Sequence, residues 1–571
     1  DLATFKYKTL HSLSWRKELT ISSCLFILVR EDKPCPTSVW DWFVGTITSS
    51  NIPVQILAFY GICKLLMLGK MTVEEDTRKK LLHDDFLTCF VDVIVENRRV
   101  ALSQEEGGGK VKWSFGVAEL MGLAKLKKKS GWYHQNRSLR ESGHFSFASA
   151  RASFIMTRSL GFEYVEKVVL LLEKMMFGNQ GTKEYEADIM ASAEIVGGIL
   201  RAVPEFEETD KANFDTLSTI IEEKLMPMVV RCNNRVSLAF GGYWVRSMQF
   251  CANHGVNQPM LLKIAINNMR TQLASTISEV QTDDDASSNS TGSFSSIANG
   301  TRLARVLFLE MDHNSAMFSN IVAELVECLK GSLDNPYKLV RHEIGSTIAL
   351  LLDKVALSGH EPALTCCRDL FDVICKQAVP GKPNIIETAM SLVSKLSKLG
   401  GHECYIIPLL PVIFYALDSS DLDLNKLAKG VAGLIAINMG QMGVEAIKVL
   451  KIIGLEASVW QWRLIATEMT DVIVTRQGAL IGLPACIHAR KAIEKMLYDP
   501  QSEVQKTAAN SLLKLLTSLH AQSESLEAVV KKYEKLASLK LLKKDEVEEE
   551  KYLKRQKQRH VGVLGLSSVV R

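Results

Sequence analysis

The sequence has few of the residues that interrupt helices, since its 571 residues include only 14 prolines. Proline inside a helix costs about 3 kcal/mol, so a long chain with so few prolines favours helix. A strong charge of either sign is also missing: 68 Lys and Arg stand against 64 Asp and Glu, a net charge of +4. This balance excludes a nucleic-acid footprint along the whole chain, and we expect no direct nucleic-acid binding. The hydrophobic content of 47% excludes a disordered or a small disulfide-stapled protein.

Long hydrophobic runs are missing too. The longest runs, residues 21–29 and 406–417, reach about half of a membrane span, so we expect no transmembrane helix and no membrane partner. No secretory signal is visible at the start of the sequence. The 12 cysteines include no Cys-x-x-Cys pair. This usage predicts reduced, mostly buried thiols and a location in the nucleus or cytosol.

Apolar residues recur at the spacing of an amphipathic helix. After Pro336, one stripe has the offsets 0, 4, 8, 11, 12 and 15, which place all six residues on one helix face. This stripe begins at Val340, and similar stripes begin at Val54, Val236, Leu424 and Val504. In three of them, the two residues after the first are polar and are predicted to face away from the core: Arg341 and His342, Asn425 and Lys426, and Gln505 and Lys506.

These stripes are evenly spaced. Val340, Leu424 and Val504 are separated by 84 and 80 residues. That is about twice the 40–47 residues of a HEAT or armadillo repeat, so a more degenerate repeat is predicted between each pair. Each copy follows a turn rich in Asp, Asn, Pro or Ser, which suits a tight helix–helix connection. The predicted fold is all-α: an ARM/HEAT-type α-solenoid of stacked antiparallel helix pairs, rather than an unrelated all-α multidomain protein.

Two segments break this pattern. One is rich in Ser, Thr and Asp and is predicted to be a disordered, low-complexity surface insert, and the other is dominated by charge and is predicted to be a helix or linker. The predicted organisation is therefore HEAT-like repeats at residues 1–278, the insert at 279–301, further repeats at 302–522, the charged segment at 523–558, and a separate piece at 559–571.

Motifs for catalysis are not found. There is no Gly-x-Ser-x-Gly and no His-Glu-x-x-His, and residues 107–110 are followed by Val111 instead of the hydroxyl residue of a phosphate-binding loop. A superficial resemblance to a calcium loop lacks the glycine that the loop needs, so we predict a helix N-terminus there; its residues are Asp418, Asp421, Asp423 and Asn425. We expect neither an enzyme nor a metal site.

Basic side chains gather in two places. Residues 123–140 contain six cations and no acid. Such a cluster can share one polyanion, for example an inositol polyphosphate or a nucleic-acid backbone, and a solvated helix end or loop is the other interpretation. Either cluster is also a candidate nuclear-localisation signal. The first cluster is Lys125, Lys127, Lys128, Lys129, Arg137 and Arg140, and the second is Lys551, Lys554, Arg555, Lys557 and Arg559. Trp460 and Trp462 are interpreted as core and rim residues of a helix start, with an exposed peptide-binding pair as the alternative.

Three stretches resemble the family of large HEAT-repeat proteasome activators. Residues 559–566, Arg-His-Val-Gly-Val-Leu-Gly-Leu, are similar to the family's Arg-His-Ala-Gly-Val-Leu-Gly-Leu, and this is the specific match. Residues 337–346 resemble a family helix with Tyr-Lys-x-Val-Arg-x-x-Ile-Gly-Ser. Residues 503–512 resemble its late Glu-Val-Arg…Ala-Ala…Leu repeat. The order of the repeats also agrees from about Ser50 onward.

The resemblance implies a non-enzymatic cap on the end of the 20S proteasome core particle, which opens the gate and promotes degradation without ATP or ubiquitin. Animal members are linked to nuclear degradation of acetylated histones in DNA repair and spermatogenesis. It further implies a bromodomain-like region at about residues 451–539, an inositol polyphosphate as a structural ligand in place of any other cofactor, and the start of the family's C-terminal domain at residues 559–571.

The sequence departs from the family at several points. The Asn-Phe pair of the acetyl-lysine region aligns with Leu519 and His520 and is not retained. The family's Tyr-Tyr-Ala tail and the N-terminal half of its shell are not seen, so we expect a truncated activator. The alternative is a nuclear transport or assembly scaffold of the importin or phosphatase-subunit type, which binds peptides on a concave solenoid face. A cryptic enzyme is a third hypothesis.

Overall fold

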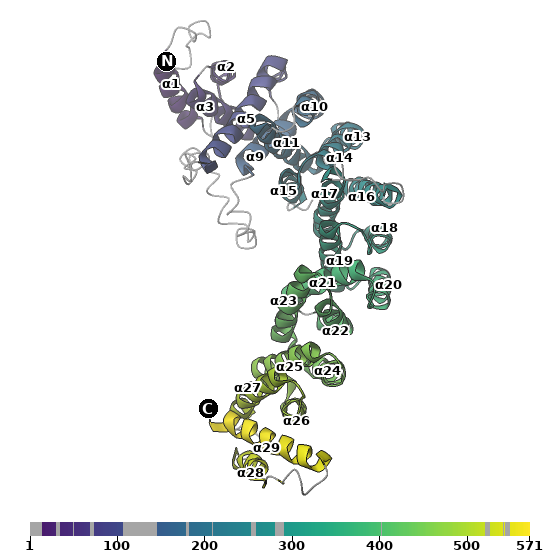
Figure 1. Cartoon of the computed structure of the whole chain (residues 1–571). Helices are drawn as coiled ribbons and strands as arrows, with labels where there is room; N and C mark the ends of the chain where they lie inside the picture. The colour runs from purple at the N-terminus through teal and green to yellow at the C-terminus, as the bar shows by residue number, and fades with distance from the viewer. Residues whose placement is uncertain are drawn as a thin grey trace. The chain divides into compact units, whose positions relative to one another are not determined.

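In the residues that the computed structural model describes, the regular secondary structure is helical, and turns join the helices (Figure 1). The chain divides into two compact units, Asp1–Ile321 and Val322–Arg571, which we describe separately. The described residues are 14–570 with the exception of 30–34, 50, 69–72, 107–144, 179–181, 208, 253–258, 280–290, 401, 520–525, 541 and 543–548.

Unit 1 is built from helices in two layers. Helices α3, α9, α11, α15 and α17 pack one against the next, and α10 contacts both α13 and α14 on the other side. The helices of unit 1 are α1 (Trp15–Leu28), α2 (Thr37–Thr46), α3 (Ile52–Leu68), α4 (Glu75–Leu81), α5 (Asp84–Glu106), α9 (Phe147–Leu160), α10 (Phe162–Met176), α11 (Lys183–Ala202), α12 (Pro204–Glu207), α13 (Lys211–Ile220), α14 (Met226–Arg235), α15 (Leu238–Ala252), α16 (Pro259–Glu279) and α17 (Thr291–Glu310). The division between the units falls within α18 (Phe318–Lys330).

Unit 2 shows the two layers more regularly. One layer is the succession α19, α21, α23, α25, α27 and α29, and the other is α20, α22, α24 and α26, with each helix in contact with the next of its layer. The helices of unit 2 are α19 (Lys338–Ser358), α20 (Glu361–Gln377), α21 (Pro383–Leu399), α22 (Glu403–Leu417), α23 (Leu422–Asn438), α24 (Gly443–Leu450), α25 (Trp460–Ile481), α26 (Leu483–Met496), α27 (Ser502–Leu519), α28 (Leu526–Ala537) and α29 (Glu549–Val570).

The spacing of the first layer confirms the predicted solenoid. Its helices start at residues 338, 383, 422, 460, 502 and 549, so successive starts are 38 to 47 residues apart. Helices α21 and α25 are the two degenerate repeats that were predicted between the three clear copies. The stripe of α19 is buried from Val340 to Val355, with each of its residues at most 1% exposed. Helix α19, which carries this apolar stripe, packs against α20 and α21.

Helices α19 and α21 approach closely at one glycine. A Cβ atom at Gly345 would lie 2.4 Å from the carbonyl oxygen of Thr388 and 2.9 Å from the backbone nitrogen of Leu392. Because both neighbours are backbone atoms, they cannot move aside for a side chain. The position therefore requires glycine.

The sequence predicts that Arg341 faces away from the core, and this prediction is wrong, because the side chain is buried. It is 7% exposed, and its Nη1 donates to the carbonyl oxygens of Asn335 (2.8 Å) and Pro336 (2.7 Å) in the preceding turn. Its Nε donates to Glu387 Oε2 on α21 over 2.7 Å, and Nη2 binds the same oxygen. Helix periodicity places a charged residue such as arginine on the solvent face. It contains no information about Glu387, the carboxylate partner that lies 46 residues further along the chain. His342 is exposed, as predicted.

The residue equivalent to Arg341 performs the same task in two other repeats. Gln505 Nε2 donates to the carbonyl oxygen of Asp499 over 2.6 Å, and Asn425 Nδ2 donates to that of Leu417 over 2.6 Å. Both side chains are part-buried rather than turned out. A long polar side chain at this position ties each helix to the turn that precedes it, and so satisfies carbonyl groups that the turn leaves unpaired.

Arg463 of α25 repeats the Arg341 arrangement in full. Its Nη1 donates to the carbonyl oxygens of Ala457 (2.8 Å) and Ser458 (3.1 Å). Its Nε and Nη2 bind the two carboxylate oxygens of Asp499, which is 5% exposed, over 2.5 and 3.0 Å. Each of these arginines thus donates hydrogen bonds to two carbonyl groups of its own repeat and to one carboxylate of the next repeat. Such full satisfaction is what allows a charge to be buried.

Unit 1 contains a buried carboxylate with fewer partners. Glu194 of α11 is fully buried, and its Oε1 accepts from the backbone nitrogen of Ser146 (2.6 Å) and lies 3.3 Å from Arg98 Nη1 of α5. Glu194 Oε2 and Arg98 Nε have no hydrogen-bond partner among the described residues. Burial raises the pKa of Glu194 to about 7, and the charge of Arg98 opposes this rise only in part.

The predicted insert is shorter than its composition indicates. Residues 291–301 form the first part of α17, where Asn299 is fully buried and its amide donates to the carbonyl oxygens of Asn233 and Val236, each over 3.2 Å. Disorder of these residues was a wrong prediction, because small polar side chains pack well at a close helix crossing. Residues 280–290 of the insert lie outside the described residues.

The predicted boundary at residue 559 does not coincide with a break in structure. Helix α29 runs from Glu549 to Val570 and packs against α27 and α28, so the end of the charged segment and the final piece share one helix. Residues 543–548 of the charged segment lie outside the described part.

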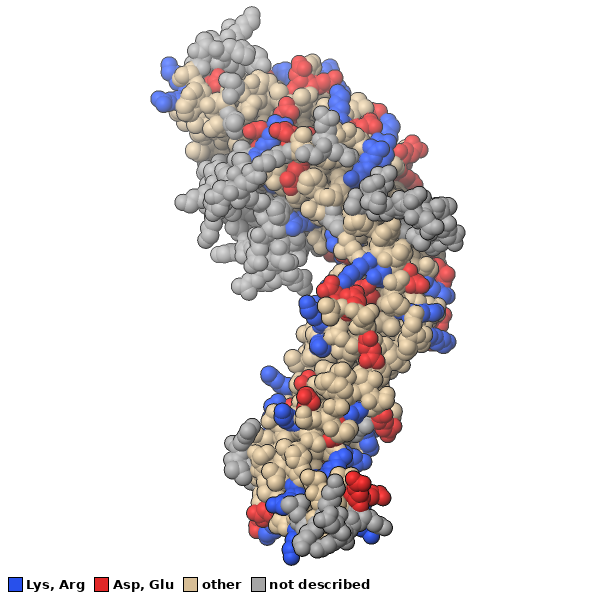
Figure 2. Space-filling view, in the orientation of Figure 1, with Lys and Arg blue, Asp and Glu red and all other residues tan. Residues whose placement is uncertain are grey.

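Three further features concern the cysteines, the apolarity of the helices and the surface charge. All 12 cysteines are free thiols, and Cys63, Cys232, Cys251, Cys328, Cys367 and Cys486 are buried. Where the chain is described, it contains no helix with the length and apolarity that a membrane span requires. On the face shown in Figure 2, positive and negative side chains are interspersed, as the near-balanced composition predicts.

Candidate functional site

The sites that were predicted from the sequence fall largely outside the described structure. The first basic cluster, between Lys125 and Arg140, belongs to residues 107–144, which are not described. Leu519 is the last residue of α27, and His520 follows it beyond the described part. The polyphosphate site and the lost acetyl-lysine pair therefore stay predictions.

The second basic cluster lies on α29. Lys554, Lys557 and Arg559 are exposed, and Arg555 Nε donates to the carbonyl oxygen of Lys540 over 3.4 Å. The cluster is thus part of a folded helix that packs on α28 through its other side. Its use as a nuclear-localisation signal stays a prediction.

The family-like motif at residues 559–566 forms the contact between α28 and α29. A Cβ atom at Gly562 would lie 2.2 Å from the backbone nitrogen of Ala537, and one at Gly565 would lie 2.2 Å from the ring of Tyr533. Tyr533 is 1% exposed and fills the space that the second glycine leaves. The two glycines therefore let the helices approach to backbone contact.

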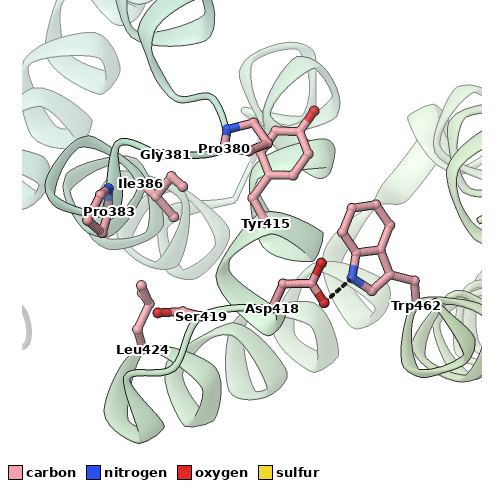
Figure 3. Close-up of a pocket in the computed structure, with 9 residues that line it drawn as sticks. All are labelled: Pro380, Gly381, Pro383, Ile386, Tyr415, Asp418, Ser419, Leu424 and Trp462. Atoms are coloured by element: carbon pink, nitrogen blue, oxygen red, sulfur yellow. Dashed lines mark hydrogen bonds between the residues drawn. The ribbon is translucent and has the colours of Figure 1, made fainter. Parts of the chain in front are cut away.

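A pocket opens in unit 2 where the turns of three successive repeats meet (Figure 3). It encloses about 270 Å³. Its lining comes from the turn before α21 and the start of α21, from the end of α22 with the turn after it, and from the starts of α23 and α25. The lining residues are Pro380, Gly381, Pro383, Ile386, Tyr415, Asp418, Ser419, Leu424 and Trp462. The walls are mainly apolar, and Asp418 is the only charged residue among these nine.

Two aromatic rings and one carboxylate form one side of the pocket. The ring centroids of Tyr415 and Trp462 are 6.0 Å apart and their planes meet at 54°. Trp462 Nε1 donates to Asp418 Oδ1 over 2.9 Å, which fixes the carboxylate beside the rings. The second carboxylate oxygen of Asp418 points to the space between the two rings in Figure 3. Trp462 also contacts the buried ring of Phe414, with the ring centroids 5.4 Å apart.

The start of α23 beside the pocket is a helix cap, as the sequence predicts. Asp421 Oδ1 accepts from the backbone nitrogens of Asp423 (2.8 Å) and Leu424 (3.4 Å), and these two hydrogen bonds hold the pKa of Asp421 below its usual value. Lys338 donates to Asp423 Oδ2 over 3.0 Å, and this bond raises the pKa of Lys338. These acids are therefore engaged in capping and pairing. Among the described residues, no His, Cys, Asp and Glu group has the geometry of a metal site.

Trp460 and Trp462 are both half-buried, so neither is the core residue that the sequence interpretation favours. The pocket was not predicted from the sequence, because its lining residues are spread between residues 380 and 462 and form no sequence motif. Two tryptophans one residue apart were the available signal. The pocket combines apolar walls, two aromatic rings and the Asp418 carboxylate, and these groups can bind a side chain of another protein.

Comparisons with known proteins find similar solved structures but no family. No family model matches the sequence, and no curated protein matches it. Similar solved structures include importin beta (10% identity over 97% of this chain and 77% of that one, TM-score 0.29) and the karyopherin Kap121p bound to the extreme C-terminus of the protein phosphatase Cdc14p (11%, 99% and 67%, TM-score 0.29). A third is the S. pombe condensin Cnd3–Cnd2 subcomplex (14%, 98% and 72%, TM-score 0.26). At these scores the likeness carries no argument about function.

Proposed function

We propose that this chain is a non-enzymatic scaffold and that it forms part of a HEAT-repeat proteasome activator. In this role it binds the end of the 20S core particle and promotes degradation that needs neither ATP nor ubiquitin. The proposal starts from the family-like stretches at residues 337–346, 503–512 and 559–566. Each of them lies in a helix of the first layer of unit 2.

The observation that carries the proposal is the position of the glycines in these stretches. Gly562 and Gly565 lie where α29 meets α28, and Gly345 lies where α19 crosses α21. A general HEAT repeat needs an apolar stripe, but it does not need glycine at these points. The matched residues thus encode particular helix crossings, and this is why we give the resemblance more weight than repeat content alone.

Further properties follow from the same proposal. We propose a nuclear and cytosolic location and, as substrates, acetylated histones in DNA repair and spermatogenesis. We assign no acetyl-lysine contact to Leu519 or His520. Inositol polyphosphate is the proposed ligand of the first basic cluster. Changing Lys127, Lys128 and Lys129 to alanine should weaken inositol-hexakisphosphate binding in calorimetry by at least about tenfold, and unchanged affinity would refute this ligand.

The alternative is a transport or assembly scaffold that binds peptides along the solenoid. The pocket beside Trp462 favours this function, since apolar walls with a single fixed charge suit a side chain of a docked segment. The two functions share the fold and differ in the partner. Affinity capture from nuclear extract, dominated by cargo or phosphatase subunits without any core-particle subunit, would select the alternative.

Peptidase stimulation tests the proposed function. Purified chain is added to latent 20S core particle, and hydrolysis of a fluorogenic tripeptide is followed with and without ATP. We expect faster hydrolysis that is independent of ATP, and importin beta serves as the solenoid control with no effect. Hydrolysis that stays at the latent rate, together with no capture of core particle by the immobilised chain, would contradict the proposal.

A further inference from the structure

We propose that the pocket formed by Tyr415, Asp418 and Trp462 binds the cationic side chain of a lysine or arginine in a basic segment of a partner protein. This inference rests on the proposed function as a scaffold, and it adds the kind of residue that a partner presents to unit 2.

The size and walls of the pocket suit one long side chain. Its volume of about 270 Å³ is just below the range of about 300–1,000 Å³ that small-molecule sites occupy. Pro383, Ile386 and Leu424 supply aliphatic wall. The hydrocarbon stem of lysine or arginine covers such a surface while its charged end stays at the polar rim.

The aromatic rings and the carboxylate select a positive charge. The faces of Tyr415 and Trp462 carry negative potential, and a cation within about 6 Å of a ring face is attracted to it. Asp418 lies beside both rings and keeps one oxygen free of Trp462, because the hydrogen bond from Nε1 reaches only Oδ1. A cation that enters the pocket beside these two rings therefore meets both aromatic side chains and a carboxylate oxygen together.

Other occupants fit this chemistry less well. A neutral side chain, acetyl-lysine included, would cover the Asp418 carboxylate without neutralising it, and a buried unpaired charge is costly. An anionic group would be repelled by the same carboxylate. Two cations adjoin lining residues in sequence: Arg463 is bound to Asp499, whereas Lys382 is exposed in the turn between Gly381 and Pro383 and is the competitor. Its removal should therefore strengthen the binding of a basic segment.

The test uses fluorescence anisotropy with the full chain at physiological salt. The probe is a fluorescein-labelled 12-residue peptide of glycine and serine that carries three arginines, with a lysine version and a glutamine version beside it. We expect both basic peptides to bind and the glutamine peptide to bind at least about tenfold more weakly, a difference of about 1.4 kcal/mol. Equal affinity of the glutamine peptide, or no binding of either basic peptide, would overturn the inference.

Asp418→Asn isolates the charge, because asparagine keeps an oxygen that can accept from Trp462 Nε1. We expect it to weaken binding of the arginine peptide by about tenfold, and Tyr415→Leu to weaken it severalfold. The matched control is Asp369→Asn, an exposed acid on α20 of the same unit, which should change affinity less than twofold. Unchanged thermal unfolding of each variant establishes that it is folded. Equal losses for Asp418→Asn and Asp369→Asn would mean diffuse attraction and would refute the pocket.

The outcome is separable from the test of the proposed function. If Asp418→Asn still associates with the core particle while wild-type chain binds no basic peptide, only the present inference fails. If the wild-type chain binds the basic peptides at this pocket but never the core particle, the proteasome role fails and the peptide-binding scaffold stands.

Discussion

The Glu194 site of unit 1 and the Arg341 and Arg463 sites of unit 2 each bury an arginine beside a carboxylate, but the buried groups are satisfied differently. In unit 2, Arg341 and Arg463 each bind a carboxylate of the next repeat and two carbonyl oxygens of their own turn. In unit 1, Glu194 is paired with Arg98, yet each side chain keeps one buried atom without a hydrogen bond among the described residues. The same repeat architecture therefore holds both a fully satisfied and a partly satisfied pair.

This difference shows what a buried ion pair contributes in a solenoid. Removing two charges from water costs several kcal/mol, and the attraction within the pair offsets this only if the remaining donors and acceptors are bonded. Arg341 and Arg463 meet that condition and link successive repeats. The Glu194 site does not meet it, and the raised pKa of Glu194 is the sign of the remaining cost.

The largest expected effect comes from Arg341→Met. The variant leaves Glu387 buried without a cation and leaves two turn carbonyl groups without their donor, so we expect unit 2 to lose about 3–5 kcal/mol of unfolding free energy. Hydrogen exchange of the α19 and α21 amides measures it. The control is Arg368→Met, whose partner Glu361 is exposed, with an expected loss below about 1 kcal/mol. Equal losses for the two variants would remove the distinction between satisfied and surface pairs.

The pH dependence of unit 1 gives the next effect. The folded-state pKa of Glu194 is about 7, above the ordinary value of 4.5, so between these values the folded state holds a proton that the unfolded state releases. This group therefore makes the local stability of unit 1 fall as pH rises from 4.5 to about 7, by about 1.4 kcal/mol for each unit of pKa difference. Glu194→Gln should abolish the fall. Exchange of α11 amides across this range measures it, and an unchanged slope in the variant would contradict the assignment.

Paired replacements compare the two sites directly. Arg98→Met with Glu194→Gln removes both charges and keeps an acceptor for Ser146, so we expect no loss or a small gain in stability. Arg341→Met with Glu387→Gln still leaves the two turn carbonyl groups without a donor and should cost about 1–3 kcal/mol. Urea unfolding of both double variants measures the contrast. A larger loss in unit 1 than in unit 2 would reverse the comparison.

The smallest effect concerns Gln505. Gln505→Ala removes the hydrogen bond to the Asp499 carbonyl oxygen and should cost about 1 kcal/mol. Its neighbour Lys506 is exposed, so Lys506→Ala should stay within about 0.5 kcal/mol. If amide hydrogen exchange in α27 is equally fast in both variants, the hydrogen bond from Gln505 to the preceding turn does not stabilise the helix.

The apolar stripes were predictable because burial of one helix face is a local, periodic property. Val340, Leu424 and Val504 each begin a buried stripe, as the spacing indicates. Arg341 and Arg463 were not predictable in this way, since their carboxylates come from the next repeat and leave no local pattern. The composition of residues 291–301 led to a wrong prediction of disorder. Serine, glycine and asparagine are frequent in disordered segments and also at close helix crossings.

The candidate pocket lay beyond prediction from the sequence alone. Tyr415, Asp418 and Trp462 belong to different helices and turns, and only the stacking of repeats places them together. Asp418 appeared in the sequence as part of an acidic cluster at a helix start. That interpretation is right for Asp421, which caps α23, whereas Asp418 binds the indole of Trp462.

Direct association with the core particle tests the central claim most plainly. In sedimentation velocity, the fluorescently labelled full chain is mixed with an excess of purified 20S core particle, with labelled importin beta as the control solenoid. We predict that the labelled chain moves in the boundary of the core particle while the control does not. A labelled chain that sediments only at its own rate at every core-particle concentration would contradict the account.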